Sequence, residues 1–324
     1  MRRREFIALV GSAAVALPRV VCAQQPMPVI VFFNSGTPST HVKNLAAFRK
    51  GLKETGLVEG QNFAIEFVRA ENRFEGLETL AAEVIARRPS VIVSNTLAAI
   101  RAKSSTTTIP IVFTTGSDPV RDGLVSSFNR PGGNVTGVVF ISSAVGGKRL
   151  ELLRKLVPKA GLIAMLVNPG TSETDAERAE VQAAAQAVGQ QIRIFEIRNT
   201  AEIETAVAAA VAAGAGALLM GAGTFWFNNR LPIVESAARH AIPAMYSTRE
   251  PVEAGGLMSY GASISEAFHQ AGLYAGRILK GEKPGDLPVI QSAKFEFMIN
   301  LKTAKTLGLQ FHPQLLATAD EVIE

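Results

Sequence analysis

The chain has 324 residues, of which 47% are hydrophobic and 19% are charged, so it can bury a full core and exceeds the size at which single cores usually divide. Its net charge of +5 falls to +2 without residues 1–23, whose four arginines and one glutamate leave 29 basic and 27 acidic residues. This balance excludes the basic footprint of a nucleic-acid-binding protein, and no nucleic acid is expected as a partner.

The first 23 residues are predicted to be an export signal. Residues 2–4 are arginines, residues 6–17 form an apolar stretch too short to span a bilayer, and residues 21–23 suit a signal peptidase. The order RRREFI resembles a twin-arginine signal, so we expect a periplasmic protein exported by a Tat-like or Sec route. An amino-terminal anchor or a mis-assigned start is the alternative. Cys22 is the only cysteine and leaves with the signal, which excludes disulfides and thiol chemistry from the mature chain.

Residues 28–60 establish the pattern that the rest of the chain repeats. An apolar run at 29–33 predicts a strand buried on both faces, and a polar loop follows it. Apolar residues then recur at helical spacing from Val42 until Gly56. The same alternation predicts further strands at 63–68, 91–93, 110–113, 135–141, 162–167, 192–197, 217–220 and 243–246, and further helices at 74–88, 147–156, 172–189, 201–213 and 231–240.

Alternating strands and helices indicate parallel sheets with right-handed crossovers. The pattern restarts near residue 143, which predicts an α/β fold of two doubly wound parallel-sheet lobes. The remaining tail has a strand at 256–260, a helix at 265–279, an extended segment at 287–300 and a last helix at 301–307, and is too short for a third domain. We therefore expect three hinge crossings that allow the lobes to close. The predicted division is 28–142 plus 258–286 for lobe 1, and 143–257 plus 287–324 for lobe 2.

The sequence does not match the known motifs of catalysis and cofactor binding. The phosphate-loop pattern around Lys148 lacks Gly at Ser142 and Ser or Thr at Arg149. Gly221 begins a dinucleotide-like run that meets Trp226 where a small residue is needed. The hydrolase-like run from Gly261 ends in serine instead of glycine. The four histidines, His41, His240, His269 and His312, share no ligand spacing. No catalytic residue, cofactor or metal is expected.

Polar residues at the predicted carboxyl ends of strands stand out instead. They are mostly uncharged donors placed beside helix amino termini, where free N–H groups hold anions, and a carboxylate is the simplest ligand. For each residue the alternative is a helix cap. The candidate ligand-binding residues are Asn34, Ser35, Asn95, Thr96, Thr115, Gly116, Ser117 and Asp118 in lobe 1, and Asn168, Thr171, Phe225, Trp226, Tyr246 and Arg249 in lobe 2.

Several of these candidates have a second interpretation. Residues 225–227 are three consecutive aromatics, of which packing on one face buries at most two, so one ring lines the cleft or all serve the core. Arg249 is a charged clamp for the ligand or part of an inter-lobe ion pair. Asp118 and Glu250 are acids that could receive an ammonium group, and Asp118 also suits a cap for a helix starting at Pro119.

Long stretches of the sequence resemble a known family. The runs that carry the likeness are QQPMPVIVFFNSG, FRKGLKETGLVEGQN, TTTIPIVFTTGSDPV, FNRPGGNVTG, KRLELLRKLVPKA, ARHAIPAMY, EAGGLMSYG and GRILKGEKPGDLPV. They resemble the ABC transporter substrate-binding family, whose best-understood members bind tryptophan or other aromatic amino acids. The resemblance implies a type I periplasmic binding fold, with solute trapped between two lobes, and a membrane permease and its ATPase as partners. The run GAGTFWFNNR after Met220 departs from the pattern of these relatives.

The sequence thus predicts a periplasmic solute-binding protein of an ABC importer, without catalysis, that captures a small carboxylate ligand. An aromatic or other amino acid is one candidate, and we expect a monomer. The alternatives are a doubly wound α/β enzyme acting on a small acid, which lacks a nucleophile, base or cofactor motif, and a transcription regulator, which would need a helix-turn-helix before the first strand.

Overall fold

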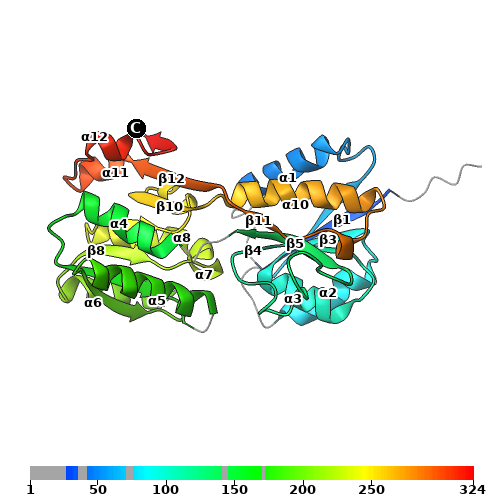
Figure 1. The fold of residues 1–324 in the computed structure, drawn as a ribbon, viewed down its shortest axis with the longest axis horizontal. Coiled ribbons are helices and arrows are strands. Elements are labelled where there is room, and N and C mark those ends of the chain that lie inside the picture. The colour runs from blue at the N-terminus through cyan, green and yellow to red at the C-terminus, as the bar shows by residue number, and fades with distance from the viewer. Residues whose placement is uncertain (1–26, 36–41, 71–75, 141–144, 170–171) are drawn as a thin grey trace, which may run out of the picture.

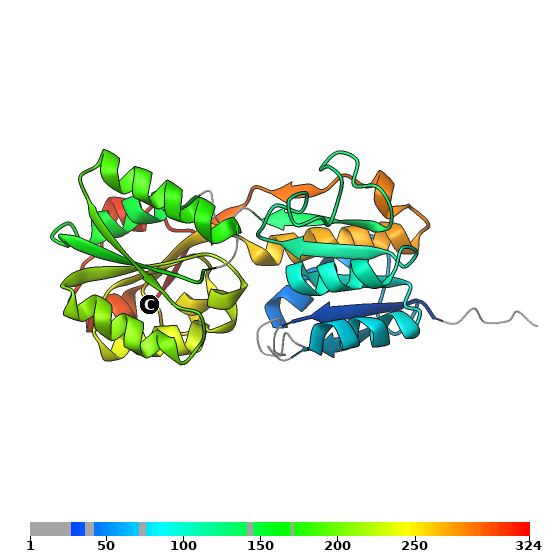
Figure 2. The ribbon, with the colours of Figure 1, turned by 90° about the horizontal axis from the view of Figure 1, so that it is seen from below.

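Two α/β lobes lie side by side in the computed structural model, joined by extended segments (Figure 1). The structure describes residues 27–35, 42–70, 76–140, 145–169 and 172–324. Each lobe is a sheet with helices on both faces, which is visible from the second direction (Figure 2). The predicted fold class of two doubly wound lobes is confirmed.

Lobe 1 contains a six-stranded sheet in the order β11-β5-β4-β3-β1-β2, and all of its strand pairs are parallel. The chain order reverses between β1 and β3, the position at which open α/β sheets bind ligands. Its elements are β1 (Val29–Asn34), α1 (Val42–Glu54), β2 (Ala64–Arg69), α2 (Leu77–Ala86), β3 (Val91–Asn95), α3 (Thr96–Ser105), β4 (Ile111–Thr115), β5 (Val135–Phe140), α10 (Ile264–Leu279), η4 (Pro284–Asp286) and β11 (Ile290–Ser292).

Lobe 2 contains a seven-stranded sheet in the order β13-β12-β10-β9-β8-β6-β7. It is parallel except where β12 runs antiparallel to β10, since β12 enters from lobe 1 in the opposite direction. Its elements are α4 (Gly146–Leu156), β6 (Leu162–Val167), α5 (Ser172–Ala187), β7 (Gln191–Glu196), α6 (Glu202–Ala212), β8 (Ala215–Met220), α7 (Thr224–Asn228), α8 (Arg230–Arg239), β9 (Ala244–Tyr246), α9 (Glu250–Glu253), β10 (Met258–Ala262), β12 (Phe295–Asn300), α11 (Leu301–Thr306), α12 (Pro313–Leu316) and β13 (Glu321–Ile323).

The strand pairs correct two of the predicted lobe boundaries. Strand β10, expected to start the return to lobe 1 at residue 258, pairs with β9 and β12 in the second sheet. Strand β11, expected in lobe 2, pairs with β5 in the first sheet. The second crossing therefore lies at Ser263, and the third lies between β11 and β12. The first crossing lies between β5 and α4, where residues 141–144 are outside the described residues.

Each sheet has a separate hydrophobic core on either face. In lobe 1, Ile30 and Phe32 pack with α1 and α10, whereas Val31 and Phe33 face α2 and α3. Alternate residues of β1 thus serve opposite cores, which explains why its whole sequence is apolar. Lobe 2 repeats this arrangement, with one core under α4 and α5 and the other under α6 and α8.

Close contact between α1 and α10 attaches the returning segment of chain to lobe 1 (Figure 1). A Cβ atom on Gly51 would lie 2.1 Å from the His269 carbonyl oxygen, and one on Gly272 would lie 2.2 Å from the Phe48 carbonyl oxygen. Only glycine fits at these positions, because the two backbones touch there.

We predict that Gly272→Ala destabilises the protein by about 1–3 kcal/mol, because the helices must separate to admit the methyl group. Urea unfolding would measure the loss. Gly161→Ala is the matched control, since a Cβ there meets nothing within 4 Å. Equal midpoints for the two variants would contradict the proposed close packing.

Candidate functional site

The carboxyl ends of the two sheets face each other. Strands of lobe 1 run toward lobe 2, and α7, which follows β8, lies on the side of lobe 2 nearest lobe 1 (Figures 1 and 2). The predicted polar loops therefore meet at the boundary between the lobes. This is the position at which a doubly wound sheet binds its ligand.

In lobe 1 the structure brings the predicted residues together through hydrogen bonds. The Asn95 amide nitrogen donates to Ser35 Oγ at 2.7 Å, which joins the ends of β1 and β3. The hydroxyl of Thr115, at the end of β4, lies 2.8 Å from Thr96 Oγ1 and 2.8 Å from Ser117 Oγ. The carboxyl ends of three strands are thus cross-linked by side chains. Gly116 is half-buried between two of these residues.

Asn34 differs from its neighbours because its side chain is buried and unpaired. It is 0% exposed, and neither Nδ2 nor Oδ1 has a hydrogen-bond partner among the described residues. Asn95 occupies the N-cap position of α3 but makes no capping hydrogen bond with its side chain. The first turn of α3 and the Asn34 amide therefore offer hydrogen bonds that the described residues do not use.

Asp118 serves as a local cap. Its Oδ1 accepts from the Val120 and Arg121 backbone nitrogens at 2.9 and 3.3 Å, and the residue is exposed. The helix expected to start at Pro119 is instead a run of turns. The capping interpretation thus accounts for the Asp118 contacts that the structure describes.

In lobe 2, two predicted residues make structural contacts. The Asn168 amide nitrogen donates to the Ile197 carbonyl oxygen at 2.7 Å, which joins the ends of β6 and β7. Tyr246 is 2% exposed in the core, where burial raises the pKa of its hydroxyl. Thr171 lies outside the described residues, as do residues 1–23 of the predicted export signal.

The three aromatics of α7 divide between the lobes. Trp226 is 4% exposed and packs in the core of lobe 2, with the Phe225 ring edge-on at 5.0 Å. Phe227 belongs instead to the core cluster of lobe 1 that contains Phe32 and Phe268. The aromatic that reaches across is therefore Phe227, which sequence analysis left out of the candidate site. The sequence signal for Phe227 was that residues 225–227 are three consecutive aromatics, whereas packing on one face buries at most two.

Arg249 is engaged by carboxylates of its own lobe, and its role as a ligand clamp stays a prediction. Its guanidinium lies 2.8 Å from Glu253, 3.2 Å from Glu296 and 2.5 Å from Glu321. The inter-lobe ion pair is made by Glu253: Lys43 Nζ on α1 lies 2.5 Å from Glu253 Oε1 on α9. Arg249 Nε donates to the same Glu253 oxygen as Lys43 Nζ, so it holds that carboxylate in position for the inter-lobe pair.

A buried ion pair supports the strand ends of lobe 2. Arg149 of α4 and Glu177 of α5 are 0% and 1% exposed and bond to each other. Glu177 Oε2 also accepts from the Ala222 backbone nitrogen at 2.7 Å, just beyond β8. Sequence analysis missed this pair, although Glu177 lies on the helical face of the buried residues Val181 and Ala185.

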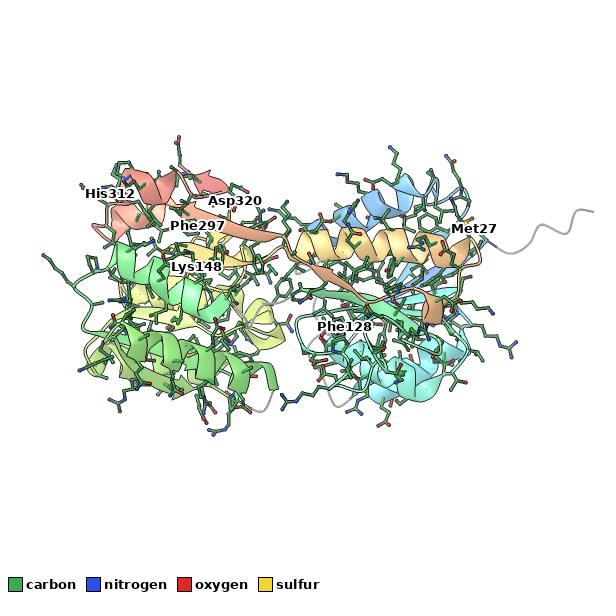
Figure 3. The ribbon with its side chains drawn as sticks, in the orientation of Figure 1. Met27, Phe128, Lys148, Phe297, His312 and Asp320 are labelled. Carbon is green, nitrogen blue, oxygen red and sulfur yellow. The ribbon has the colours of Figure 1, made fainter. Side chains whose placement is uncertain are left out.

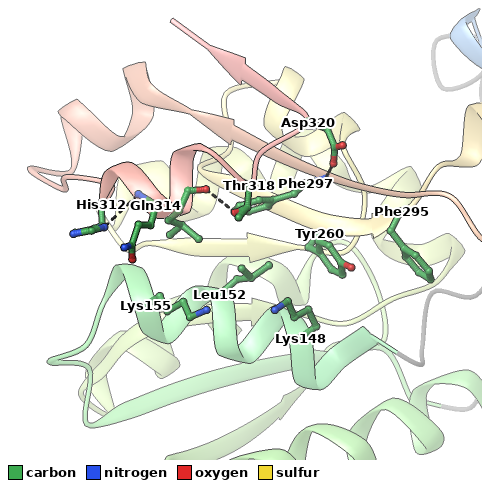
Figure 4. A pocket seen from close by; sticks show the side chains of 11 residues that line it. Lys148, Leu152, Lys155, Tyr260, Phe295, Phe297, His312, Gln314, Thr318 and Asp320 are labelled. Carbon is green, nitrogen blue, oxygen red and sulfur yellow. Dashed lines mark hydrogen bonds between the residues drawn. The ribbon is translucent and has the colours of Figure 1, made fainter.

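A separate pocket of ≈ 680 Å³ lies between α4, the sheet and α12 in lobe 2 (Figure 3). In close-up, Lys148 and Lys155 of α4 face Tyr260 and the carboxyl-terminal segment (Figure 4). Both ammonium groups already bond to Glu151, at 2.9 and 2.6 Å. Because its lining comes from one lobe only, this pocket cannot enclose a solute between lobes. The lining residues are Lys148, Leu152, Lys155, Tyr260, Phe295, Phe297, His312, Gln314, Leu315, Thr318 and Asp320.

The described residues contain neither a cluster of metal-binding side chains nor a helix suited to a membrane. No group of three or more His, Cys, Asp or Glu side chains there could hold a metal ion. No described helix is both long and apolar enough to cross a membrane.

Comparisons with known proteins agree with this architecture. The crystal structure of an ABC domain in complex with L-Trp from Streptococcus pneumoniae has a TM-score of 0.82 and 25% identity, over 91% of this chain and 99% of that one. A periplasmic solute-binding protein from Actinobacillus succinogenes with bound D-allose has a TM-score of 0.60 and 16% identity, over 86% and 99%. These likenesses define a substrate-binding protein of the type I periplasmic fold.

The sequence comparisons identify the family. The family model described as ABC transporter substrate binding protein matches residues 29–323, and the chain belongs to that family. A tyrosine-binding protein from Clostridioides difficile is 29% identical over 265 residues, which cover 81% of this chain and 76% of that protein. Members of the family are non-enzymatic binders, so this chain is a binding protein and the enzyme alternative is set aside.

We predict that Arg149→Met destabilises the protein by about 3–5 kcal/mol, because it leaves Glu177 as a buried charge without its partner. Denaturant unfolding followed by circular dichroism would measure this. Arg178→Met, which removes a half-exposed pair with Glu196, is the control and should cost less than about 1 kcal/mol. A small effect at Arg149 would contradict the supporting role of the pair.

Proposed function

We propose that the protein is the periplasmic solute-binding component of an ABC importer and captures a small carboxylate ligand, an aromatic amino acid above all, between its lobes. The proposal includes export by the amino-terminal signal, and delivery of the solute to a membrane permease driven by its ATPase. The observation that carries it is the fully buried Asn34, which has no hydrogen-bond partner among the described residues and lies beside the first turn of α3, where Asn95 makes no side-chain cap.

The chemistry of that place suits a carboxylate. Free N–H groups of a helix amino terminus carry partial positive charge, and an amide side chain adds a further donor. The Thr96, Thr115 and Ser117 hydroxyls form a hydrogen-bonded chain beside it, which ends where Ser117 Oγ donates to the Asp122 carboxylate. An anion can be held there by the Asn34 amide and the helix N–H groups, which are already in place, so little ordering is needed on binding.

Relatives support the choice of an aromatic amino acid. One relative is named a tyrosine-binding protein, and one structural neighbour contains L-Trp. Neighbours that bind sugars, such as the D-allose complex, are more distant in sequence. A neutral sugar would leave the anion-binding groups of lobe 1 without an anion to bind.

A thermal-shift screen of amino acids, aromatic carboxylates and sugars tests the proposal. A ligand at about a hundred times its dissociation constant should stabilise the protein by about 2.7 kcal/mol. We expect aromatic amino acids to raise the melting temperature and sugars to leave it unchanged. A shift with a sugar and none with any carboxylate would overturn the proposed ligand class.

We predict that Asn34→Leu weakens ligand binding about tenfold while leaving the free energy of unfolding of the free protein unchanged or higher. An unpaired buried amide costs stability, and replacing it by an apolar side chain of similar size removes that cost together with its hydrogen bonds to ligand. Isothermal titration calorimetry and urea unfolding would separate the two effects.

The control is Asn300→Leu, because Asn300 is also buried but its amide caps α11 through the Thr303 nitrogen at 3.1 Å. This variant should lose stability and keep its affinity. If Asn34→Leu behaved in the same way, Asn34 would be a structural residue.

A further inference from the structure

The pocket of ≈ 680 Å³ between α4, the sheet and α12 combines an aromatic wall with two lysines. Its volume lies within the range of small-molecule sites, which is about 300–1,000 Å³. All of its lining residues belong to lobe 2, so a ligand can enter it whether or not the lobes close. The pocket is therefore separate from the proposed site between the lobes, and an inference about it goes beyond the proposed function.

The neighbouring strands β10 and β12 build the aromatic wall. The rings of Tyr260 and Phe295 lie nearly parallel, at 9°, with their centroids 6.0 Å apart. Phe297, which pairs with Tyr260 in the antiparallel register, meets the Tyr260 ring at 66° with a centroid separation of 6.3 Å. Phe297 is buried, whereas Tyr260 and Phe295 are only half-buried. The wall thus keeps aromatic surface on which a further planar ring can stack.

Lys148 and Lys155 of α4 face this wall (Figure 4). Each ammonium group has three N–H donors and gives one hydrogen bond to Glu151, at 2.9 and 2.6 Å. The lysine side chains are 44% and 55% exposed and that of Glu151 is 46% exposed, so solvent weakens both ion pairs. Either lysine can therefore turn a donor toward an anion in the pocket, because Glu151 stays in contact with water.

The acid of the lining is already bonded within the chain. Asp320 accepts a hydrogen bond from the Phe297 backbone nitrogen at 2.7 Å, which ties the carboxyl-terminal segment to β12. The Thr318 hydroxyl likewise donates to the Leu315 carbonyl oxygen at 2.7 Å. The two lysines are thus the charged groups of the lining that have donors to spare for a ligand.

We propose that this pocket is a second ligand site and that it takes a planar aromatic carboxylate. The ring stacks on Tyr260 and Phe295, and the carboxylate accepts hydrogen bonds from Lys148 or Lys155. An uncharged aromatic molecule would use the wall alone, and a small inorganic anion would use the lysines alone. An aromatic carboxylate is the class of ligand that engages both.

Calorimetric titration of the full chain with 2-naphthoate and with its uncharged amide, 2-naphthamide, tests the site. We expect the wild-type protein to prefer the carboxylate about tenfold, because hydrogen bonds to charged groups are the stronger ones. The double variant Lys148→Ala/Lys155→Ala should lose about tenfold in affinity for 2-naphthoate for the same reason. Tyr260→Leu should weaken both probes about threefold, because it removes a stacking face.

The matched control is Glu151→Gln, which breaks the same two ion pairs but keeps both lysines. It should keep or increase the affinity for 2-naphthoate, and a loss equal to that of the double variant would make the lysines structural and overturn the inference. Equal affinities of the wild-type protein for the two probes, or no binding of either, would also overturn it.

A second control separates this pocket from the site between the lobes. Asn34→Leu should keep the 2-naphthoate binding that the double variant loses. If Asn34→Leu lost that binding and the double variant kept it, the probe would bind at the strand ends of lobe 1. That result would overturn the second site and leave the proposed function standing.

Discussion

The contact between α1 and α10 is the constraint on which the arrangement of the two lobes depends. Helix α10 is held in lobe 1 by the contact of its backbone with that of α1, through Gly51 and Gly272, and by its apolar face, which packs on the lobe 1 sheet. Once α10 is fixed there, the chain must leave lobe 2 after β10 and re-enter it at β12. Two of the hinge crossings therefore follow from the placement of α10 in lobe 1.

The residues at the strand ends are held in place by different contacts in the two lobes. In lobe 1, neutral side chains bond to one another across three strands, which holds them in place without a buried charge. In lobe 2, a buried Arg149–Glu177 pair holds the loop after β8 from behind. Preorganisation of this kind reduces the ordering cost of binding. Among the described residues near the strand ends, Asn34 Nδ2 and Oδ1, Ser94 Oγ and Trp226 Nε1 are buried without a hydrogen-bond partner.

Much of the fold could be predicted because parallel strands buried on both faces read as short apolar runs, and β1, β6 and β8 were recognisable from that alone. The lobe boundaries could not be, since a strand such as β10 does not reveal which sheet it joins. Its partner β12 comes from a remote part of the chain. The same limit applies to the candidate site.

Strand-end position correctly predicted that Ser35, Asn95 and Thr115 lie together, because topology alone brings them to one edge. It gave no sign of the ion pairs of Arg249, whose partners Glu296 and Glu321 lie on strands far along the chain. Tyr246 looked like a site residue for the same reason, yet its side chain turned into the core. The position on a strand determines where a residue lies, whereas long-range packing determines where its side chain points and which residues it contacts.

The ion pair between Lys43 and Glu253 shows why the ligand must supply most of the energy of closure. Lys43 is 65% exposed and Glu253 22% exposed, so solvent screens their attraction. Pairs of this kind contribute about 0.2–1 kcal/mol, which changes the ratio of two conformations by a factor of five at most. A ligand that binds only the closed form can shift the same equilibrium by several orders of magnitude, in proportion to its differential affinity. The ion pair can therefore align the lobes without trapping them empty, and under the proposed function the solute between them decides whether they stay closed.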